Sequence, residues 1–267
     1  MVEATHSNNG SIDEPQSDEE THYHSDVEGQ RYAYRLIHGI PGPPFMRQSV
    51  CASLRKTWSP RNDDIFVVTY PKSGTTWMQQ VLLLLLRGGG TEDFDLTVKS
   101  ADSPWLEGTL SQTFEPRTRE WLDALPSRRI LKTHSPLRIF PSIPGENGAM
   151  PYAGGAKTIF VVRNPKDTAV SFFHHARNKA AFQFADGEWP AFFDIFMRGG
   201  VGSGDWFEFV TEWWDLAQRR PTSVLWVHYE EMLKSPGAQI LRIAHFLGVA
   251  PVDEQRLSRP VSQPCTL

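Results

Sequence analysis

The chain is poor in cysteine and in long apolar runs, and these two shortages exclude several classes of protein. Cys51 and Cys265 are the only cysteines among its 267 residues, too few for a disulfide framework, which favours a reducing compartment. The longest apolar run, residues 81–86, is far shorter than the roughly 20 residues that span a bilayer. The polar N-terminus also lacks the apolar segment of a signal peptide. We therefore expect a cytoplasmic protein that has no membrane partner.

Lys and Arg are absent from residues 1–30, which carry eight acids and few large apolar side chains. Such a segment cannot bury enough surface to offset its ordering entropy, so we expect a disordered acidic tail in which His6, His22 and His24 are solvated. Removing its eight negative charges changes the net charge from −4 to +4 for residues 31–267. A mildly basic body suits an anionic ligand, but the excess is too small to indicate a nucleic-acid partner.

Short apolar segments alternate with helical patterns along the remaining chain. We predict strands at 65–70, 130–133, 158–162 and 224–228, and helices at 75–87, 165–179, 205–219 and 236–247. Gly88–Gly90 ends the first of these helices, and the glycine- and proline-rich residues 141–155 form a loop. This alternation predicts a single α/β domain with a central parallel β-sheet flanked by helices. Ligands of such sheets bind at the carboxyl ends of the strands.

The sequence Tyr70-Pro-Lys-Ser-Gly-Thr-Thr-Trp77 follows the first strand and opens a helix. Backbone N–H groups at a helix N-terminus attract anions, Gly74 permits close approach, and Lys72 supplies a positive charge. An ordinary helix capped by threonine is the alternative. The lysine precedes the glycine, unlike the Gly-x-x-x-x-Gly-Lys-Ser/Thr loop, and no apolar strand ends in an acid suited to Mg²⁺. A P-loop kinase is therefore disfavoured, although it remains an alternative.

A second strand-turn-helix, residues 161–171, contains Arg163 and Ser171. Arg163 follows the strand directly, where a guanidinium group can bind a phosphate in a forked geometry. Ser171 lies two turns into the helix. Both have structural alternatives, because Arg163 could pair with Asp167 and Ser171 could bond to its own helix.

Four segments in this order together resemble the cytosolic sulfotransferase family over about residues 36–248. They are the two motifs above, with Leu131-Lys-Thr-His-Ser-Pro136 between them, and His228-Tyr-Glu-Glu-Met232; weaker similarities lie at 38–41, 103–107 and 212–216. The resemblance implies a P-loop-like strand-loop-helix that binds the sulfate donor 3′-phosphoadenosine 5′-phosphosulfate (PAPS). It also implies sulfuryl transfer to a hydroxyl or amine of a small, hydrophobic or aromatic acceptor, without a metal. The product of the donor would be 3′-phosphoadenosine 5′-phosphate (PAP).

The resemblance also implies roles for individual residues. His134 matches the general base, while Lys72 and Lys132 match catalytic lysines. Residues that match the donor site are Lys72, Ser73, Gly74, Thr75 and Thr76 at the 5′-phosphosulfate, Trp77 at the adenine, Arg163 and Ser171 at the 3′-phosphate, and Tyr229 in the pocket. A histidine suits deprotonation of a hydroxyl near neutral pH, although a single histidine at a strand end is more often structural.

The acceptor pocket implied by the resemblance has an aromatic wall. Its residues are Trp105, Phe140, Phe172, Phe173 and His175. An apolar wall suits a flat or hydrophobic acceptor. His175 stands where relatives often carry an aromatic residue, so it either admits a more polar acceptor or lies at the rim.

Family members continue beyond the point where this sequence stops, at Leu267. The continuation carries an Arg-Lys-Gly loop around the 3′-phosphate and the dimerisation segment. We therefore expect residues 31–267 to be a sulfotransferase domain that lacks this segment and forms a monomer or weak homodimer. A weakly active or inactive PAPS- or PAP-binding homologue is the alternative. A Golgi carbohydrate sulfotransferase is disfavoured, because no transmembrane anchor is visible.

Overall fold

The computed structural model describes residues 20–25, 30–86, 102–111, 117–140 and 155–249. Predictions for residues elsewhere fall outside these described residues: His6, the glycines at 88–90, the loop at 141–154, Cys265 and the expected shortfall at the C-terminal end. Within the described ranges, no helix combines the length and the apolar character needed to cross a membrane.

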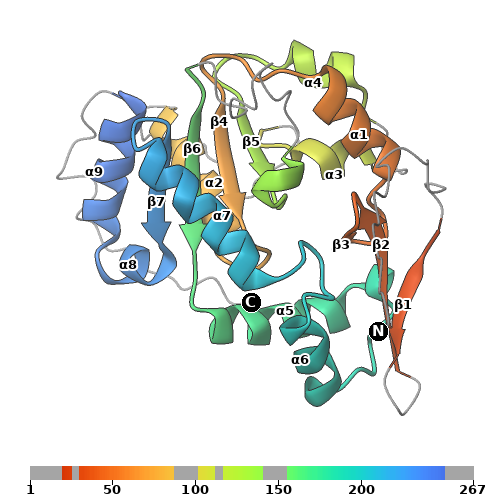
Figure 1. Cartoon of the computed structure of the whole chain (residues 1–267). Coiled ribbons are helices and arrows are strands. Elements are labelled where there is room, and N and C mark those ends of the chain that lie inside the picture. The colour runs from red at the N-terminus through yellow and green to blue at the C-terminus, as the bar shows by residue number, and fades with distance from the viewer. Residues whose placement is uncertain (1–19, 26–29, 87–101, 112–116, 141–154, 250–267) are drawn as a thin grey trace, which may run out of the picture.

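A parallel four-stranded sheet forms the centre, in the order β5-β4-β6-β7 (Figure 1). These strands are β4 (Ile65–Thr69), β5 (Ile130–Thr133), β6 (Lys157–Val162) and β7 (Val224–His228). Each lies within one residue of its predicted bounds. The register places Val68 opposite both Thr133 and Phe160, so the carboxyl ends of three strands meet at one edge.

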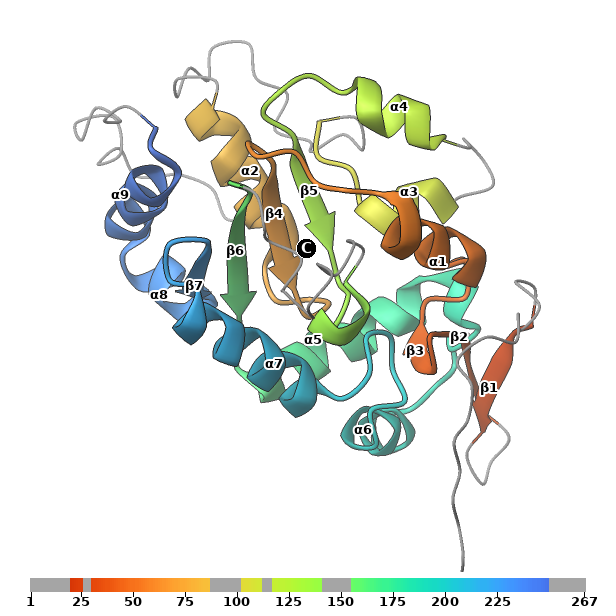
Figure 2. The same cartoon turned by 45° about the horizontal axis from the view of Figure 1, so that its top comes forward.

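Helices cover both faces of this sheet (Figure 2). Alternate strand side chains point to opposite faces. Phe66 and Val68 pack in one core cluster with residues of α7 (Trp206–Arg219). Ile65 and Val67 pack in the other, with α2 (Thr75–Leu86), α8 (Tyr229–Lys234) and α9 (Pro236–Leu247). Burial on both faces explains why the strands are almost continuously apolar, and the α/β prediction is confirmed.

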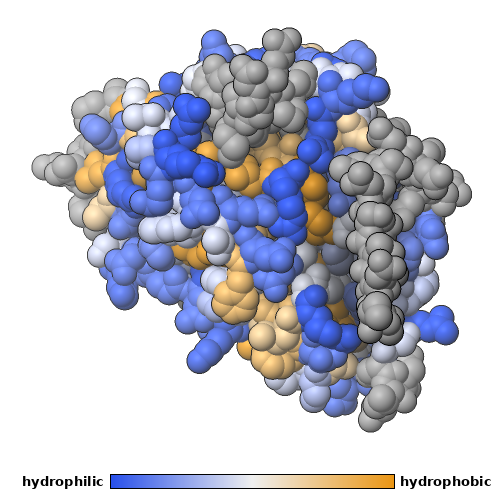
Figure 3. Space-filling model, in the orientation of Figure 1, coloured by the Kyte–Doolittle hydropathy of each residue, from blue (hydrophilic) through white to orange (hydrophobic). Residues whose placement is uncertain are grey.

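The helix α5 (Pro165–Asn178) follows β6 and begins at a strong cap, because the Asn164 side chain accepts a hydrogen bond from the backbone N–H of Lys166. After the short η2 (Ala180–Phe182) comes α6 (Trp189–Met197), which the sequence pattern did not predict. Trp189, Phe193 and Met197 are exposed one turn apart on α6. Apolar side chains gather on this face around α6 and the start of α7 (Figure 3).

A small antiparallel sheet of β1 (His22–Ser25), β2 (Arg31–Ile37) and β3 (Ile40–Gly42) stands beside the main sheet. The expected disorder of residues 1–30 is therefore wrong for the four residues of β1. The ring of His24 stacks on Tyr34 with centroids 4.4 Å apart, and its Nε2 hydrogen-bonds with the carbonyl oxygen of Gly200 at 3.1 Å. Strand pairing and these long-range contacts supply burial that local composition does not reveal, so His22 and His24 are not solvated tail residues.

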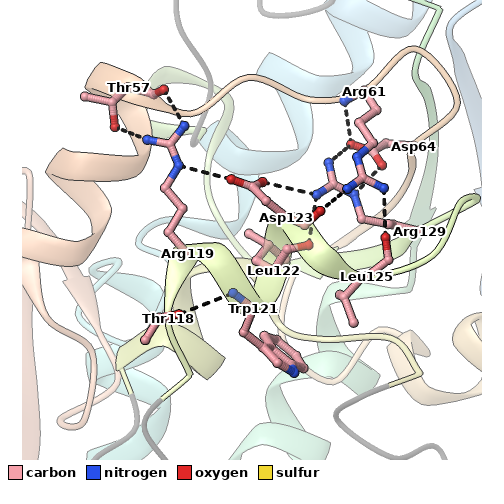
Figure 4. A network of polar contacts seen from close by, with 10 residues as sticks. All are labelled: Thr57, Arg61, Asp64, Thr118, Arg119, Trp121, Leu122, Asp123, Leu125 and Arg129. Carbon is pink, nitrogen blue, oxygen red and sulfur yellow. Dashed lines mark hydrogen bonds and ion pairs between the residues drawn. The ribbon is translucent and has the colours of Figure 1, made fainter.

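The remaining elements, α1 (Gln48–Thr57), α3 (Leu106–Ser111), α4 (Arg119–Ala124) and η1 (Leu137–Ile139), lie on the side of β5 (Figures 1 and 2). A polar network at the amino end of the sheet joins α1 and α4 to the segments that precede β4 and β5 (Figure 4). Arg129 donates two hydrogen bonds to Asp64, at 2.7 and 2.6 Å, and both side chains are fully buried. Because Asp64 precedes β4 and Arg129 precedes β5, this pair fixes the two strands side by side.

Candidate active site

The turn between β4 and α2 is built around two residues with positive φ. Lys72 has φ +70°, Gly74 has φ +101°, and the backbone N–H of Ser73 donates to the carbonyl oxygen of Tyr70 at 3.2 Å. A Cβ atom on Gly74 would lie 2.7 Å from Cδ2 of Tyr229, so glycine is required by conformation and by space. The first intrahelical bond runs from Met78 to Gly74. The N–H groups of the preceding turn are therefore left for a ligand.

The hydroxyl groups of this turn are partly engaged by one another. Thr69 and Thr75 form a buried hydrogen bond between their Oγ1 atoms, 2.7 Å long. Ser73 is fully buried, and its Oγ lies 3.5 Å from Oγ1 of Thr168. Thr76 is exposed at the helix N-terminus. These bonds hold the turn in shape before any anion binds, which is the preorganisation that anion recognition needs.

Arg163 lies beside the turn rather than beside Asp167. Its Nη1 donates to the carbonyl oxygen of Lys72 at 3.0 Å, and its guanidinium lies 4.7 Å from the ring centroid of Tyr229. Its Nε is buried and has no hydrogen-bond partner among the described residues. A buried donor without a partner fits a site whose ligand is an anion. Ser171 lies on the same segment, half-buried, in the second turn of α5.

Trp77 and Tyr229 form an aromatic corner next to the turn. Their ring centroids are 5.6 Å apart in an edge-to-face arrangement. Trp77 comes from the first turn of α2 and Tyr229 from the start of α8, directly after β7. The structure therefore brings three of the predicted donor-site residues, Trp77, Arg163 and Tyr229, into one cluster around the turn.

His134 follows β5 and is oriented by the neighbouring strand. Its Nδ1 lies 2.8 Å from the carbonyl oxygen of Thr69 and 3.2 Å from the hydroxyl of that residue. A carbonyl oxygen can only accept, so Nδ1 carries the proton and Nε2 keeps its lone pair in the neutral ring. Burial, reinforced by the charge of Lys132, lowers the pKa of His134 to about 3. The ring is therefore neutral near neutral pH, and its Nε2 offers a lone pair.

Two lysines lie close to this histidine. Burial lowers the pKa of Lys132, while the carboxylate of Glu107 opposes the shift. Burial and the charge of Arg163 lower the pKa of Lys72. No carboxylate among the described residues forms an ion pair with either lysine. Positive charge that no ion pair neutralises favours the binding of an anion.

The residues predicted for the acceptor pocket form two groups: Trp105 and His175 lie near His134 and the lysines, and the three phenylalanines lie in the core. Trp105 contacts His134 edge to face at 5.1 Å, and its indole lies under Nζ of Lys132 at 5.3 Å. The pKa of His175 is lowered to about 4 by burial and then by the charge of Lys72. Phe140 and Phe172 are instead almost fully buried in the main core cluster. Phe173 is buried in the same cluster.

Three residues of the site were not singled out by their local sequence. Thr69 holds Nδ1 of His134 through its backbone, so its side-chain type gave no signal. Lys179 lies near enough to Lys72 to lower its pKa. Glu107 lies beneath the Thr133–Ser135 segment and accepts hydrogen bonds from it. A buried acid in an apolar segment was the available signal, but an acid in the first turn of a helix is also an ordinary pattern.

An anion-binding turn, a neutral histidine and lysines without an ion pair to the described carboxylates, at the carboxyl edge of a parallel sheet, define a group-transfer site for a phosphorylated donor. Within the described residues, no cluster of three or more His, Cys, Asp or Glu side chains could hold a metal ion.

Comparison with known proteins specifies this class further. The family model described as "Sulfotransferase domain" matches residues 62–263. Sulfotransferase 1C2 of Oryctolagus cuniculus is 33% identical over 241 residues, which cover 88% of this chain and 74% of that protein. Sulfotransferase 1A1 of Rattus norvegicus is 34% identical over 215 residues, covering 80% and 69%. The chain belongs to the sulfotransferase family and is a PAPS-dependent transferase.

Solved structures agree with this assignment. The crystal structure of mouse sulfotransferase SULT7A1 complexed with PAP is 30% identical, with a TM-score of 0.62, and the match covers 81% of this chain and 70% of that one. Retinol dehydratase in complex with androsterone and PAP is 25% identical, with a TM-score of 0.64, covering 90% and 72%. The family predicted from the sequence motifs is therefore confirmed.

Proposed function

We propose that this protein transfers the sulfuryl group of PAPS to a hydroxyl or amine of a small, hydrophobic or aromatic acceptor, with His134 as the general base. The observation that carries the proposal is the 2.8 Å contact between Nδ1 of His134 and the carbonyl oxygen of Thr69. It leaves Nε2 as the basic atom, next to the anion-binding turn.

The donor site is proposed from the residues around the turn. Lys72, Ser73, Gly74, Thr75 and Thr76 would hold the 5′-phosphosulfate, and Arg163 with Ser171 would hold the 3′-phosphate. Trp77 and Tyr229 would pack against the adenine. The buried, unpartnered Nε of Arg163 and the space kept open by Gly74 both fit this anion. When bound, PAPS supplies an activated sulfuryl group with a good leaving group.

The proposed transfer forms one bond to sulfur, breaks another and moves one proton. The acceptor oxygen or nitrogen forms a bond to sulfur while the bond from sulfur to the phosphate oxygen breaks, and PAP leaves. The acceptor proton goes to Nε2 of His134. Lys72 and Lys132 stabilise the negative charge that develops on the leaving phosphate. Sulfuryl transfer in this form resembles phosphoryl transfer, in which positioning and charge stabilisation supply most of the rate.

The surroundings of the base favour an acceptor with an apolar body. Trp105 packs edge to face on His134, and Phe45 packs edge to face on Trp105 at 5.5 Å. Aromatic groups beside the base suit a phenol or a sterol better than a sugar. Androsterone is bound by the related retinol dehydratase, which supports testing sterols. His175 adds a neutral polar group near the base, and this favours acceptors that carry a second polar substituent.

A transfer assay with PAPS across phenols, sterols and amines tests the proposal. We expect turnover with at least one class. His134→Ala should lower kcat by about 1,000-fold, within the range that general base catalysis contributes, while the affinity for PAP measured by calorimetry changes little. His174→Ala, which removes an exposed imidazole of α5, is the matched control. An equal loss of turnover and of PAP affinity in His134→Ala would refute the assignment of the base.

A further inference from the structure

Glu107, in the first turn of α3, is a buried acid under the segment that carries His134. Its side chain is about 2% exposed. Its Oε1 accepts hydrogen bonds from the hydroxyl of Thr133 at 2.7 Å, the hydroxyl of Ser135 at 2.9 Å and the backbone N–H of His134 at 3.4 Å. Its Oε2 is buried without a partner in the described part of the chain. Burying a half-satisfied carboxylate is costly.

The hydrogen bonds of Glu107 close a ring around the backbone of His134. The N–H of Ser135 donates to Oγ1 of Thr133 at 3.0 Å, and both hydroxyls donate to Glu107. The position of His134 along the chain is therefore fixed by its two neighbours. The imidazole ring of His134 is held from the opposite side, because its Nδ1 hydrogen-bonds to the carbonyl oxygen of Thr69.

The segment that carries Glu107, residues 103–107, is also connected to the helix of the proposed donor site. Nε2 of Gln79, in α2, donates to the carbonyl oxygen and to the hydroxyl of Ser103, each at 2.9 Å. Trp105 forms an isolated parallel bridge with Lys132 and packs against His134. The segment 103–107 thus joins the helix that begins at the anion-binding turn to the residue that takes the proton.

Glu107 is also the negative group beside Lys132. The titratable groups near this lysine come from three elements, namely Glu107 in α3, His134 after β5 and His175 in α5. Burial lowers the pKa of Lys132, and Glu107 acts against that shift. Both histidines have lowered pKa values and are neutral near neutral pH. Glu107 is therefore the group among these three that favours the charged form of Lys132.

We propose that Glu107 is a positioning residue of the transfer reaction, clamping the Thr133–Ser135 segment so that His134 faces the acceptor and placing a negative charge beside Lys132. This inference rests on the proposed role of His134 as the base. Glu107 lies beneath the segment that carries His134, and it acts through the hydrogen bonds and the charge described above.

The test compares Glu107→Gln with Glu107→Asp in steady-state transfer from PAPS, over a range of pH. Glu107→Gln keeps the shape but removes the charge. Its kcat should fall by about 100-fold, the cost of misplacing a reacting group by about 1 Å, while KM for PAPS stays within a factor of about three. The alkaline limb of its kcat profile should move to lower pH, because Lys132 loses the nearby negative charge.

Glu107→Asp keeps the charge on a shorter side chain. We expect a low kcat together with an alkaline limb close to that of the wild type. Thr109→Val is the matched control, because Thr109 is buried in the same helix and its side chain makes no hydrogen bond to the described residues. Its kcat and pH profile should equal those of the wild type. All rates are divided by the concentration of PAP-binding sites, so that unfolded protein does not count.

A wild-type kcat and pH profile in Glu107→Gln, per PAP-binding site, would overturn the proposal. If that variant does not fold, the double variant Thr133→Val/Ser135→Ala removes the clamp and leaves the charge. The proposal requires a lower kcat with an unshifted alkaline limb there, and an unchanged kcat would overturn it. Failure of the proposed role of His134 can be distinguished from this outcome. In that case His134→Ala would turn over as fast as the wild type.

Discussion

The two ends of the central sheet differ in whether their positively charged side chains form ion pairs. At the amino end, Arg129 is paired with Asp64 through two short hydrogen bonds, and further bonds join it to α4 (Figure 4). At the carboxyl end, Lys72, Lys132 and Arg163 form no ion pair with a carboxylate of the described residues. The first arrangement pairs the buried charges and ties together the segments before β4 and β5. The second leaves charge available for an anion, as expected of an active site.

The largest effect on activity should come from Lys72→Ala. This change removes a positive charge that forms no ion pair with a carboxylate of the described residues, so we expect transfer from PAPS to fall by about 1,000-fold. The free energy of unfolding should not decrease, because the free enzyme loses a desolvated charge rather than a bond. Transfer assays and urea unfolding measure the two quantities. Retained turnover would contradict the proposed role of the turn.

The corresponding change at the other end is Arg129→Ala. It leaves Asp64 buried without its partner, so the free energy of unfolding should fall by about 3–5 kcal/mol. Arg119→Ala is the matched control, since Arg119 forms an exposed ion pair with Asp123, and it should cost about 1 kcal/mol or less. Urea unfolding again measures both. Similar losses for the two variants would remove the distinction between the buried pair and the exposed one.

Gly74→Ala should weaken PAP binding by about 30-fold, as expected for backbone strain of about 2 kcal/mol. Alanine is disfavoured at φ +101°, and its Cβ would press on Tyr229. Gly237→Ala is the control, because no atom lies within 4 Å of a Cβ at that position. Calorimetry with PAP gives both affinities. Equal affinities for the two variants would show that the turn tolerates a side chain.

Lowering the pH should destabilise the protein through its buried histidines. The pKa of His134 is about 3 in the folded protein and about 6.5 in the unfolded chain. Between these values the unfolded state binds more protons, so stability falls as the pH falls through this window. His134→Asn should therefore lose less stability than the wild type between pH 7 and pH 4. Parallel pH curves for the two proteins would contradict the lowered pKa.

The sheet and the turn could be predicted from the sequence because their signals are local. Four apolar strands followed by helices predicted the α/β fold, and the order of the motifs around Lys72, His134 and Arg163 predicted the family. The strand at 22–25 could not be predicted, because it depends on Tyr34 and Gly200, which are distant in the sequence. Glu107 lies within one of the weaker motifs, at 103–107, but its proposed role depends on hydrogen bonds to β5. Long-range contacts of this kind leave no periodic pattern.

Calorimetric titration with PAP of the wild type and of Arg163→Ala tests most directly whether the carboxyl end of the sheet is an anion site. We expect the wild type to bind and Arg163→Ala to bind about 30-fold more weakly, since a hydrogen bond to a charged group contributes about 2 kcal/mol. The free energy of unfolding without ligand should fall by only about 1 kcal/mol in Arg163→Ala, because the variant loses the hydrogen bond to the carbonyl oxygen of Lys72. No binding by the wild type, or equal affinities, would contradict the account.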